Sequence, residues 1–211
     1  MPVHISNLLL THSSGIYPVP LSGIFYPTFF LMNIAPPPSS QDFGFYNRYI
    51  FKVKQPDLIN ALKDNWRDLQ KLYNNLSPEM LQYRYDTGKW NMKEIIQHLI
   101  DAERNFCYRS MRISRKDTTP IPIYDMDSFI ANAHVDSRDI GSLMKELELV
   151  RSLTINMFDG MYPAMLEQTG PARDVTVSVR AMGFAIVGHV MHHMDIIKER
   201  YLTAFNTISG E

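Results

Sequence analysis

Three of the chain's seven histidines lie within five residues of one another, in the stretch VGHVMHHMDIIKER near the C-terminus. His189 and His193 are four residues apart, so they lie about 40° apart around the axis of an α-helix. Their β-carbons are then about 5–6 Å apart, and both imidazoles can reach one ion. The spacing indicates a metal site. It leaves open the alternative of core histidines that are satisfied by hydrogen bonds.

A third ligand has to come from elsewhere, because two histidines on one helical turn are too few to hold a metal ion tightly. His98 is the candidate, since it lies beside the apolar stripe of another predicted helix, in KEIIQHLIDAE. A three-histidine set leaves coordination positions open for water or substrate, as in catalytic metal sites. We expect His192 at the edge of the metal site, where it could donate a hydrogen bond to a ligand but would not bind the metal itself. We expect His134 at a helix end or in solvent.

Four long amphipathic segments must position these histidines, at about residues 55–75, 91–113, 138–161 and 178–201. In each of them apolar residues recur every three or four positions. Asn91 and Glu94 predict a capping box for the second helix, and Ser178 predicts an N-cap for the fourth. A short helical turn is expected at SFIANA, and DVTVSV is interpreted as a loop because it is short and isolated. The pattern predicts an all-α fold, a four-helix bundle with long connections.

Charge and proline content divide the chain. Residues 1–41 contain no Lys, Arg, Asp or Glu, which predicts a leader or arm; a further hypothesis is that native translation starts at Met32. No basic residue precedes its first apolar run and prolines interrupt the later ones, so neither a signal peptide nor a membrane helix is expected. Residues 42–205 are predicted to form a single domain, and residues 206–211 a tail.

Composition excludes several classes of function. The formal net charge of −1 gives no electrostatic footprint for nucleic acid or an anionic membrane. The single cysteine, Cys107, excludes an internal disulfide and a cysteine-rich zinc site, and fits a cytoplasmic location. The zincin pattern H-E-x-x-H, the G-x-S-x-G motif and the glycine-rich phosphate and dinucleotide loops do not occur.

Two motifs resemble the DinB/YfiT-like superfamily of four-helix metalloproteins, and the resemblance extends from about residue 43 to 203. KWNMKEIIQHLIDAE resembles the W-x-x-x-E-x-x-x-H-L-x-D-x-E pattern of the second helix in that family, and GHVMHHMDIIKERYL resembles its closing G-H-x-x-H-H-x-x-I-I segment. The resemblance implies a four-helix bundle in which His98, His189 and His193 bind one divalent metal ion. Zinc and nickel are the favoured metals, although nitrogen ligands also suit copper, iron and cobalt. It further implies that two bundles pair as a homodimer.

The same resemblance implies a metal-dependent enzyme, a transferase that joins a small-molecule thiol to an electrophilic substrate. The cation would lower the pKa of the thiol, and in a related hydrolase it would lower the pKa of water. Asp101 lies one turn from His98 and is a catalytic candidate that could orient an imidazole or accept a proton; a solvated helix acid is the alternative.

Arg180 and Arg200 flank the core stripe of the last helix and could hold a substrate carboxylate, although solvated surface cations are the simpler interpretation. A hypothesis from a different class is a non-enzymatic metal-binding or stress-related interaction protein. In that case the ion would have a structural role and would lock the second and fourth helices together.

Overall fold

The computed structural model describes residues 33–205. The predictions of a leader before residue 33 and of a tail after residue 205 lie outside the described residues. Residues 33–41 belong to the stretch without charged side chains, and they contact the bundle. Ile34 is 1% exposed. Its N–H donates to Oδ2 of Asp57, and its carbonyl oxygen accepts from the N–H of Leu58.

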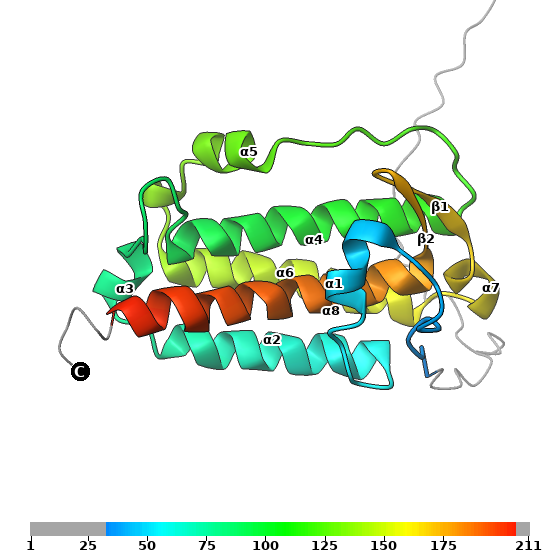
Figure 1. Cartoon of the computed structure of the whole chain (residues 1–211), viewed down its shortest axis with the longest axis horizontal. Helices are drawn as coiled ribbons and strands as arrows, with labels where there is room; N and C mark the ends of the chain where they lie inside the picture. The colour runs from blue at the N-terminus through cyan, green and yellow to red at the C-terminus, as the bar shows by residue number, and fades with distance from the viewer. Residues whose placement is uncertain (1–32, 206–211) are drawn as a thin grey trace, which may run out of the picture. The chain divides into compact units, whose positions relative to one another are not determined.

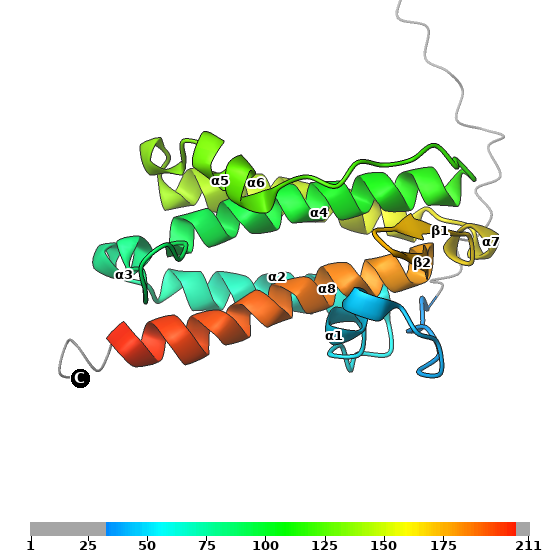
Figure 2. The same ribbon diagram turned by 45° about the horizontal axis from the view of Figure 1, so that its top comes forward.

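Four long helices form a bundle, which confirms the predicted fold class. They are α2 (Leu58–Asn74), α4 (Met92–Ser114), α6 (Ile140–Asp159) and α8 (Val179–Ile196), and a π-helix, η3 (Ile197–Leu202), extends α8. Both α2 and α4 pack against α6 and α8, so the consecutive helices α2 and α4 lie mainly on a diagonal of the bundle (Figure 1). Figure 2 shows α4 with α6 as one layer and α2 with α8 as the other.

The helices begin where the sequence offers caps. The side chain of Asn91 accepts from the N–H of Glu94, whose carboxylate accepts in return from the N–H of Asn91, which is the predicted capping box. Ser178 caps α8 through the N–H of Ala181, as predicted. The first long helix begins a few residues later than expected, at Leu58, because Asp57 caps it.

Short elements precede the first long helix or connect the long helices. They are η1 (Gly44–Tyr46), α1 (Asn47–Ile50), α3 (Pro78–Gln82), α5 (Met126–Asn132), η2 (Val135–Ser137) and α7 (Pro163–Leu166). The helical turn expected at SFIANA is part of α5. The connection between α4 and α5 runs back along α4 (Figure 1). It therefore covers one side of the helix that carries His98.

The interpretation of DVTVSV as a loop is wrong. Four of its six residues form strand β2 (Val175–Ser178), which pairs antiparallel with β1 (Thr169–Ala172). The register places Ala172 opposite Val175, so the turn consists of Arg173 and Asp174. The sequence of β1, TGPA, contains glycine and proline, which are uncommon in strands, so no local pattern predicts a pairing partner for β2.

A buried polar network ties three of the long helices together. Arg151 of α6 is 1% exposed, and its Nε and Nη2 atoms each donate at 2.8 Å to the carboxylate of Glu103 in α4. Nη1 of Arg151 donates to the carbonyl oxygen of Leu62 and to Oδ1 of Asn65, both in α2. Within residues 33–205, no helix is long and apolar enough to cross a membrane.

Candidate metal centre

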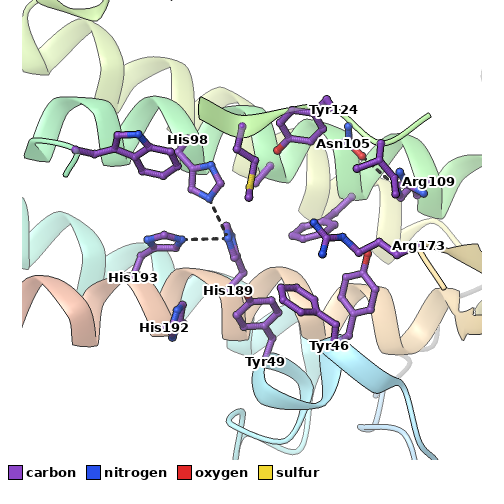
Figure 3. A pocket seen from close by; sticks show the side chains of 16 residues that line it. Tyr46, Tyr49, His98, Asn105, Arg109, Tyr124, Arg173, His189, His192 and His193 are labelled. Atoms are coloured by element: carbon purple, nitrogen blue, oxygen red, sulfur yellow. Dashed lines mark hydrogen bonds between the residues drawn. The ribbon is translucent and has the colours of Figure 1, made fainter. Parts of the chain in front are cut away.

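Three imidazoles from two helices meet inside the bundle. α4 contributes His98, and α8 contributes His189 and His193 (Figure 3). Nε2 of His189 lies 3.2 Å from Nε2 of His98 and 3.2 Å from Nε2 of His193. A ligand atom from each of the three side chains lies within 4.8 Å of the others. The structure therefore brings together the three histidines that the sequence analysis singled out.

Burial keeps these imidazoles uncharged. His98 is 3% and His189 is 6% exposed. Burial lowers the pKa of His98 to about 4. Burial, followed by the charges of the neighbouring histidines, lowers the pKa values of His189 and His193 well below their usual range. At neutral pH all three rings are therefore neutral, which is the form that binds a metal ion.

Aromatic rings surround the cluster and hold its orientation. Tyr49 of α1 and Phe106 of α4 contact His189 edge-on, with ring centroids 5.2 Å and 5.6 Å away. Trp90, just before α4, contacts His98 at 4.8 Å. The carbonyl oxygen of Trp90 accepts a hydrogen bond of 2.5 Å from the Tyr201 hydroxyl in η3. The π-helical segment thus contacts the residue that packs on His98.

The chemistry of this donor set fits a divalent metal ion. Each neutral imidazole has one ring nitrogen with a lone pair that can accept a hydrogen bond or bind a metal. Hydrogen bonds among the three rings cannot occupy all three lone pairs, because Nε2 of His189 has two nitrogen neighbours at the same distance. Two nitrogens bound to one tetrahedral ion at about 2.0–2.1 Å would lie about 3.3 Å apart, close to the 3.2 Å found here. Imidazole nitrogen suits zinc, nickel, copper and iron.

The cluster forms one end of a cavity of about 220 Å³. Its walls are supplied by η1, α1, α4, α8, the α4–α5 connection, the start of α5 and the hairpin turn. The walls are aromatic and apolar except for the histidines and a few hydrogen-bonding side chains. The lining residues are Phe45, Tyr46, Tyr49, Trp90, His98, Ala102, Asn105, Phe106, Arg109, Ile123, Tyr124, Met126, Arg173, His189, His192 and His193. A small molecule in this cavity would lie against the three imidazoles.

The other two histidines within residues 33–205 take the positions expected of them. His192 is partly exposed at the edge of the cavity, and its ring lies 5.6 Å from that of Tyr49. His134 is exposed and precedes η2 with a positive φ of 50°.

Asp101 does not line the cavity. Its Oδ1 accepts from Nε2 of Gln97 at 3.1 Å, and burial raises its pKa. Its negative charge contributes to the raised pKa of Tyr124, which does line the cavity. The catalytic role of Asp101 stays a prediction.

Neither of the arginines considered in the sequence analysis lines the cavity. Arg180 pairs with Glu167 and donates to the carbonyl oxygen of Ala35, and Arg200 is exposed on η3. The arginines that line it are Arg109 and Arg173, which the sequence analysis missed. A signal for Arg109 was present, because residues 98, 102, 105 and 109 follow helical spacing along one face of α4. Arg173 had no such signal, since its position depends on the hairpin.

Comparison with known proteins gives consistent results. A family model of the DinB superfamily matches residues 61–197, a range that includes His98, His189 and His193. A protein of Oceanobacillus iheyensis named as a putative metal-dependent hydrolase is 21% identical over 132 residues, which cover 62% of this chain and 75% of that protein. A Bacillus pumilus protein with the same description is 26% identical over 148 residues, which cover 67% of this chain and 81% of that protein.

The structural comparison concerns the fold. YfiT from Bacillus subtilis, described as a probable metal-dependent hydrolase with an unusual four-helix bundle topology, superposes with a TM-score of 0.63. The match covers 82% of this chain and 93% of that one, at 15% sequence identity. It confirms the four-helix bundle.

Proposed function

The chain belongs to the DinB superfamily, and from that premise we propose that it is a metal-dependent enzyme whose divalent cation is held by His98, His189 and His193. The observation that carries the proposal is the convergence of three neutral, desolvated imidazoles at the end of a cavity. Zinc or nickel is the proposed metal, as the nitrogen donor set allows.

The cation would supply Lewis acidity and lower the pKa of a water molecule or a thiol in an open coordination position. The protein's own residues would position the imidazoles, exclude water and orient the second reactant. Tyr49, Phe106 and Trp90 hold the imidazoles in place and exclude water from around them. The cavity walls orient the second reactant.

Between the two reactions, the cavity favours thiol transfer over hydrolysis. Besides the histidines, its polar wall groups are the amide of Asn105, the guanidinium groups of Arg109 and Arg173 and the hydroxyls of tyrosines. Burial raises the pKa values of Tyr46 and Tyr49, and raises that of Tyr124 to about 12, so these phenols stay protonated. Such a wall donates hydrogen bonds. None of the described residues that line the cavity is a carboxylate, so the wall offers no general base to activate water, whereas a thiol has a lower pKa than water and loses its proton more readily at a cation.

Hydrolysis is the second candidate, and the relatives described as metal-dependent hydrolases support it. Asp101 is the carboxyl group proposed to assist proton transfer. It does not line the cavity, but its charge adds to the effect of burial in raising the pKa of Tyr124, which does. A homodimeric state and a cytoplasmic location rest on the resemblance and the composition alone, and they stay predictions.

The rival proposal is a structural metal in a non-enzymatic protein. A structural zinc site is closed by four protein ligands. Among the described residues, the cluster of potential ligands has three members, and a cavity adjoins it. This arrangement supports a replaceable fourth ligand, and hence the enzyme.

The test is a turnover assay on tag-free protein that has been stripped by a chelator and reloaded with zinc or nickel. Glutathione, bacillithiol and mycothiol are each supplied with a panel of electrophiles, and esters and amides are supplied without thiol. We expect turnover that requires both metal and thiol, is lost in His98→Ala and persists in His134→Ala, the exposed-histidine control. Turnover without thiol would select the hydrolase. Protein that binds metal but is inert in every assay, and that unfolds when stripped, would contradict both.

A further inference from the structure

We propose that the cavity binds its substrate through an oxyanion, a carboxylate or a phosphate, which Arg109 and Arg173 hold at the end away from the histidines. The inference rests on the proposed function in one respect, because it takes the histidine end as the reactive end. Figure 3 shows the imidazoles on one side of the cavity and both arginines on the other.

Arg109 is a buried cation without a carboxylate partner in the described part of the chain. It is 5% exposed. Its Nε donates to Oδ1 of Asn105 at 3.0 Å, and its Nη2 donates to the carbonyl oxygen of Pro122 at 3.2 Å. These two acceptors are neutral, and Nη1 donates to no described residue. A charge withdrawn from water without a counterion is costly, so an anion in the cavity would offset that cost.

Arg173 approaches the cavity from the turn of the β1–β2 hairpin. Its φ of +58° lies in the left-handed region, which is uncommon for a residue other than glycine and is often found at functional sites. Its guanidinium lies 4.7 Å from the centroid of the Phe45 ring, and it reaches toward the interior of the cavity. Within residues 33–205 it forms no ion pair. Its charge is therefore available to a ligand.

Neutral donors complete this end of the cavity. The charges of Arg109 and Arg173 act on the phenols of both Tyr46 and Tyr124, where they oppose the rise in pKa that burial causes. All four side chains line the same cavity, and both phenols stay protonated. Two guanidinium groups and two hydroxyls that line one cavity form a set of hydrogen-bond donors, and guanidinium groups are suited to binding carboxylate and phosphate oxygens.

The walls between the two ends are apolar. Ala102 and Phe106 lie between His98 and Arg109 along α4, and Ile123 and Met126 also line the cavity. The substrate class that fits is a small molecule with an apolar or aromatic body, an oxyanion at one end and the reacting group at the other. In this arrangement the arginines would position the substrate and determine specificity, and the histidines would carry the chemistry.

The test compares three probes of similar shape by calorimetric titration of the full-length, metal-loaded protein at pH 7.5. They are phenylacetate, phenyl phosphate and the uncharged phenylacetamide. We expect at least one of the two anions to bind about tenfold or more tightly than the amide, as charge-assisted hydrogen bonds typically provide. Comparing the two anions distinguishes a carboxylate site from a phosphate site.

Arg109→Gln and Arg173→Gln are each expected to lower this preference about tenfold. Arg173 is exposed, so its variant tests the inference even if the Arg109 variant fails to fold. Arg48→Gln is the matched control, because the Arg48 guanidinium stacks on the same Phe45 ring, at 4.3 Å, but does not line the cavity. The control is expected to keep the full preference.

Equal binding of the anions and the amide by the unmodified protein would overturn the inference, and so would a preference that survives Arg173→Gln unchanged. Repeating the titrations with His98→Ala separates the two proposals. A preference that persists in that variant supports the arginine site even if the metal assignment fails. A preference that disappears there, but survives in both arginine variants, places the anion at the histidines and contradicts the inference.

Discussion

Gly188 of α8 lies directly against the backbone of Tyr49 in α1: a β-carbon at position 188 would be 1.9 Å from the Tyr49 carbonyl oxygen. This close approach lets the short helix α1 pack onto α8 one residue before His189. The Tyr49 ring then contacts both His189 and His192. The absence of a side chain at residue 188 thus allows one wall of the histidine cavity to form.

Gly188→Ala should displace α1, because a backbone atom cannot move aside as the end of a side chain can. We expect the free energy of unfolding to fall by about 1–3 kcal/mol, as is typical of overpacking, and metal affinity to fall with it. Urea denaturation and metal titration measure the two effects. Gly141→Ala is the control, since an added β-carbon there approaches only the Asp139 side chain, at 3.0 Å. Equal stability of the two variants would contradict the role of Gly188.

Glu103→Gln should be strongly destabilising. It leaves the 1% exposed Arg151 without its counterion, and it alters the carboxylate oxygen that accepts from the Thr154 hydroxyl at 2.7 Å. Breaking a buried pair from one side typically costs about 3–5 kcal/mol. Glu148→Gln, which breaks the exposed pair with Lys145, should change stability by less than about 1 kcal/mol. Chemical denaturation of both variants tests this, and a loss of less than about 1 kcal/mol for Glu103→Gln would rule out a stabilising role for the pair.

The metal-free protein should lose stability as the pH falls from about 6.5 to 4. The unfolded chain takes up a proton on His98 near the usual histidine pKa of about 6.5, whereas burial lowers the pKa of His98 to about 4 in the folded chain. Lowering the pH through this window therefore favours the unfolded state, by about 3 kcal/mol for His98 alone. Urea midpoints of the stripped protein across this range should fall, and less steeply in His98→Ala. The same slope in both proteins would contradict the burial of a neutral His98.

Asp101→Asn distinguishes two roles for this carboxyl group: an electrostatic effect on Tyr124, and direct proton transfer in the reaction. Its charge acts on Tyr124, and it accepts from Gln97 rather than from an imidazole. We therefore expect kcat to fall less than tenfold, with metal content unchanged and with a shift in the pH–rate profile that a purely structural role would not cause. A hundredfold or larger loss of kcat, the usual effect of removing a general acid or base, would instead establish direct proton transfer by Asp101.

The helices were predictable because their signals are local. Apolar residues at helical spacing, the Asn91–Glu94 capping box and the Ser178 cap all act within a few residues of one another, and the structure confirms each of them. The pairing of His189 and His193 follows from helix geometry alone. Bringing His98 to the same place required the family pattern, because no local rule states that α4 packs beside α8.

The rest of the cavity depends on contacts that are distant in sequence. Arg173 reaches the cavity only because Thr169–Ala172 pairs with Val175–Ser178, and Gly170 lets β1 approach α4: an added β-carbon there would lie 2.7 Å from Cγ1 of Ile113. Arg180 and Arg200 are suggested by the sequence only because they flank the core stripe of the last helix, and solvated surface cations are the simpler interpretation there. In the folded chain Arg180 pairs with Glu167 and Arg200 is exposed, and neither lines the cavity. Both facts depend on the fold and cannot be deduced from the local sequence.

Metal content per chain tests the central proposal most directly. Tag-free protein loaded with zinc and dialysed is measured by elemental analysis, alongside His98→Ala, His193→Ala and the rim control His192→Ala. We predict one equivalent of zinc in the unmodified protein and in the His192 variant, and almost none in the other two, with the helical circular dichroism of all four alike. A full equivalent of zinc retained by His98→Ala would contradict the assignment of the site.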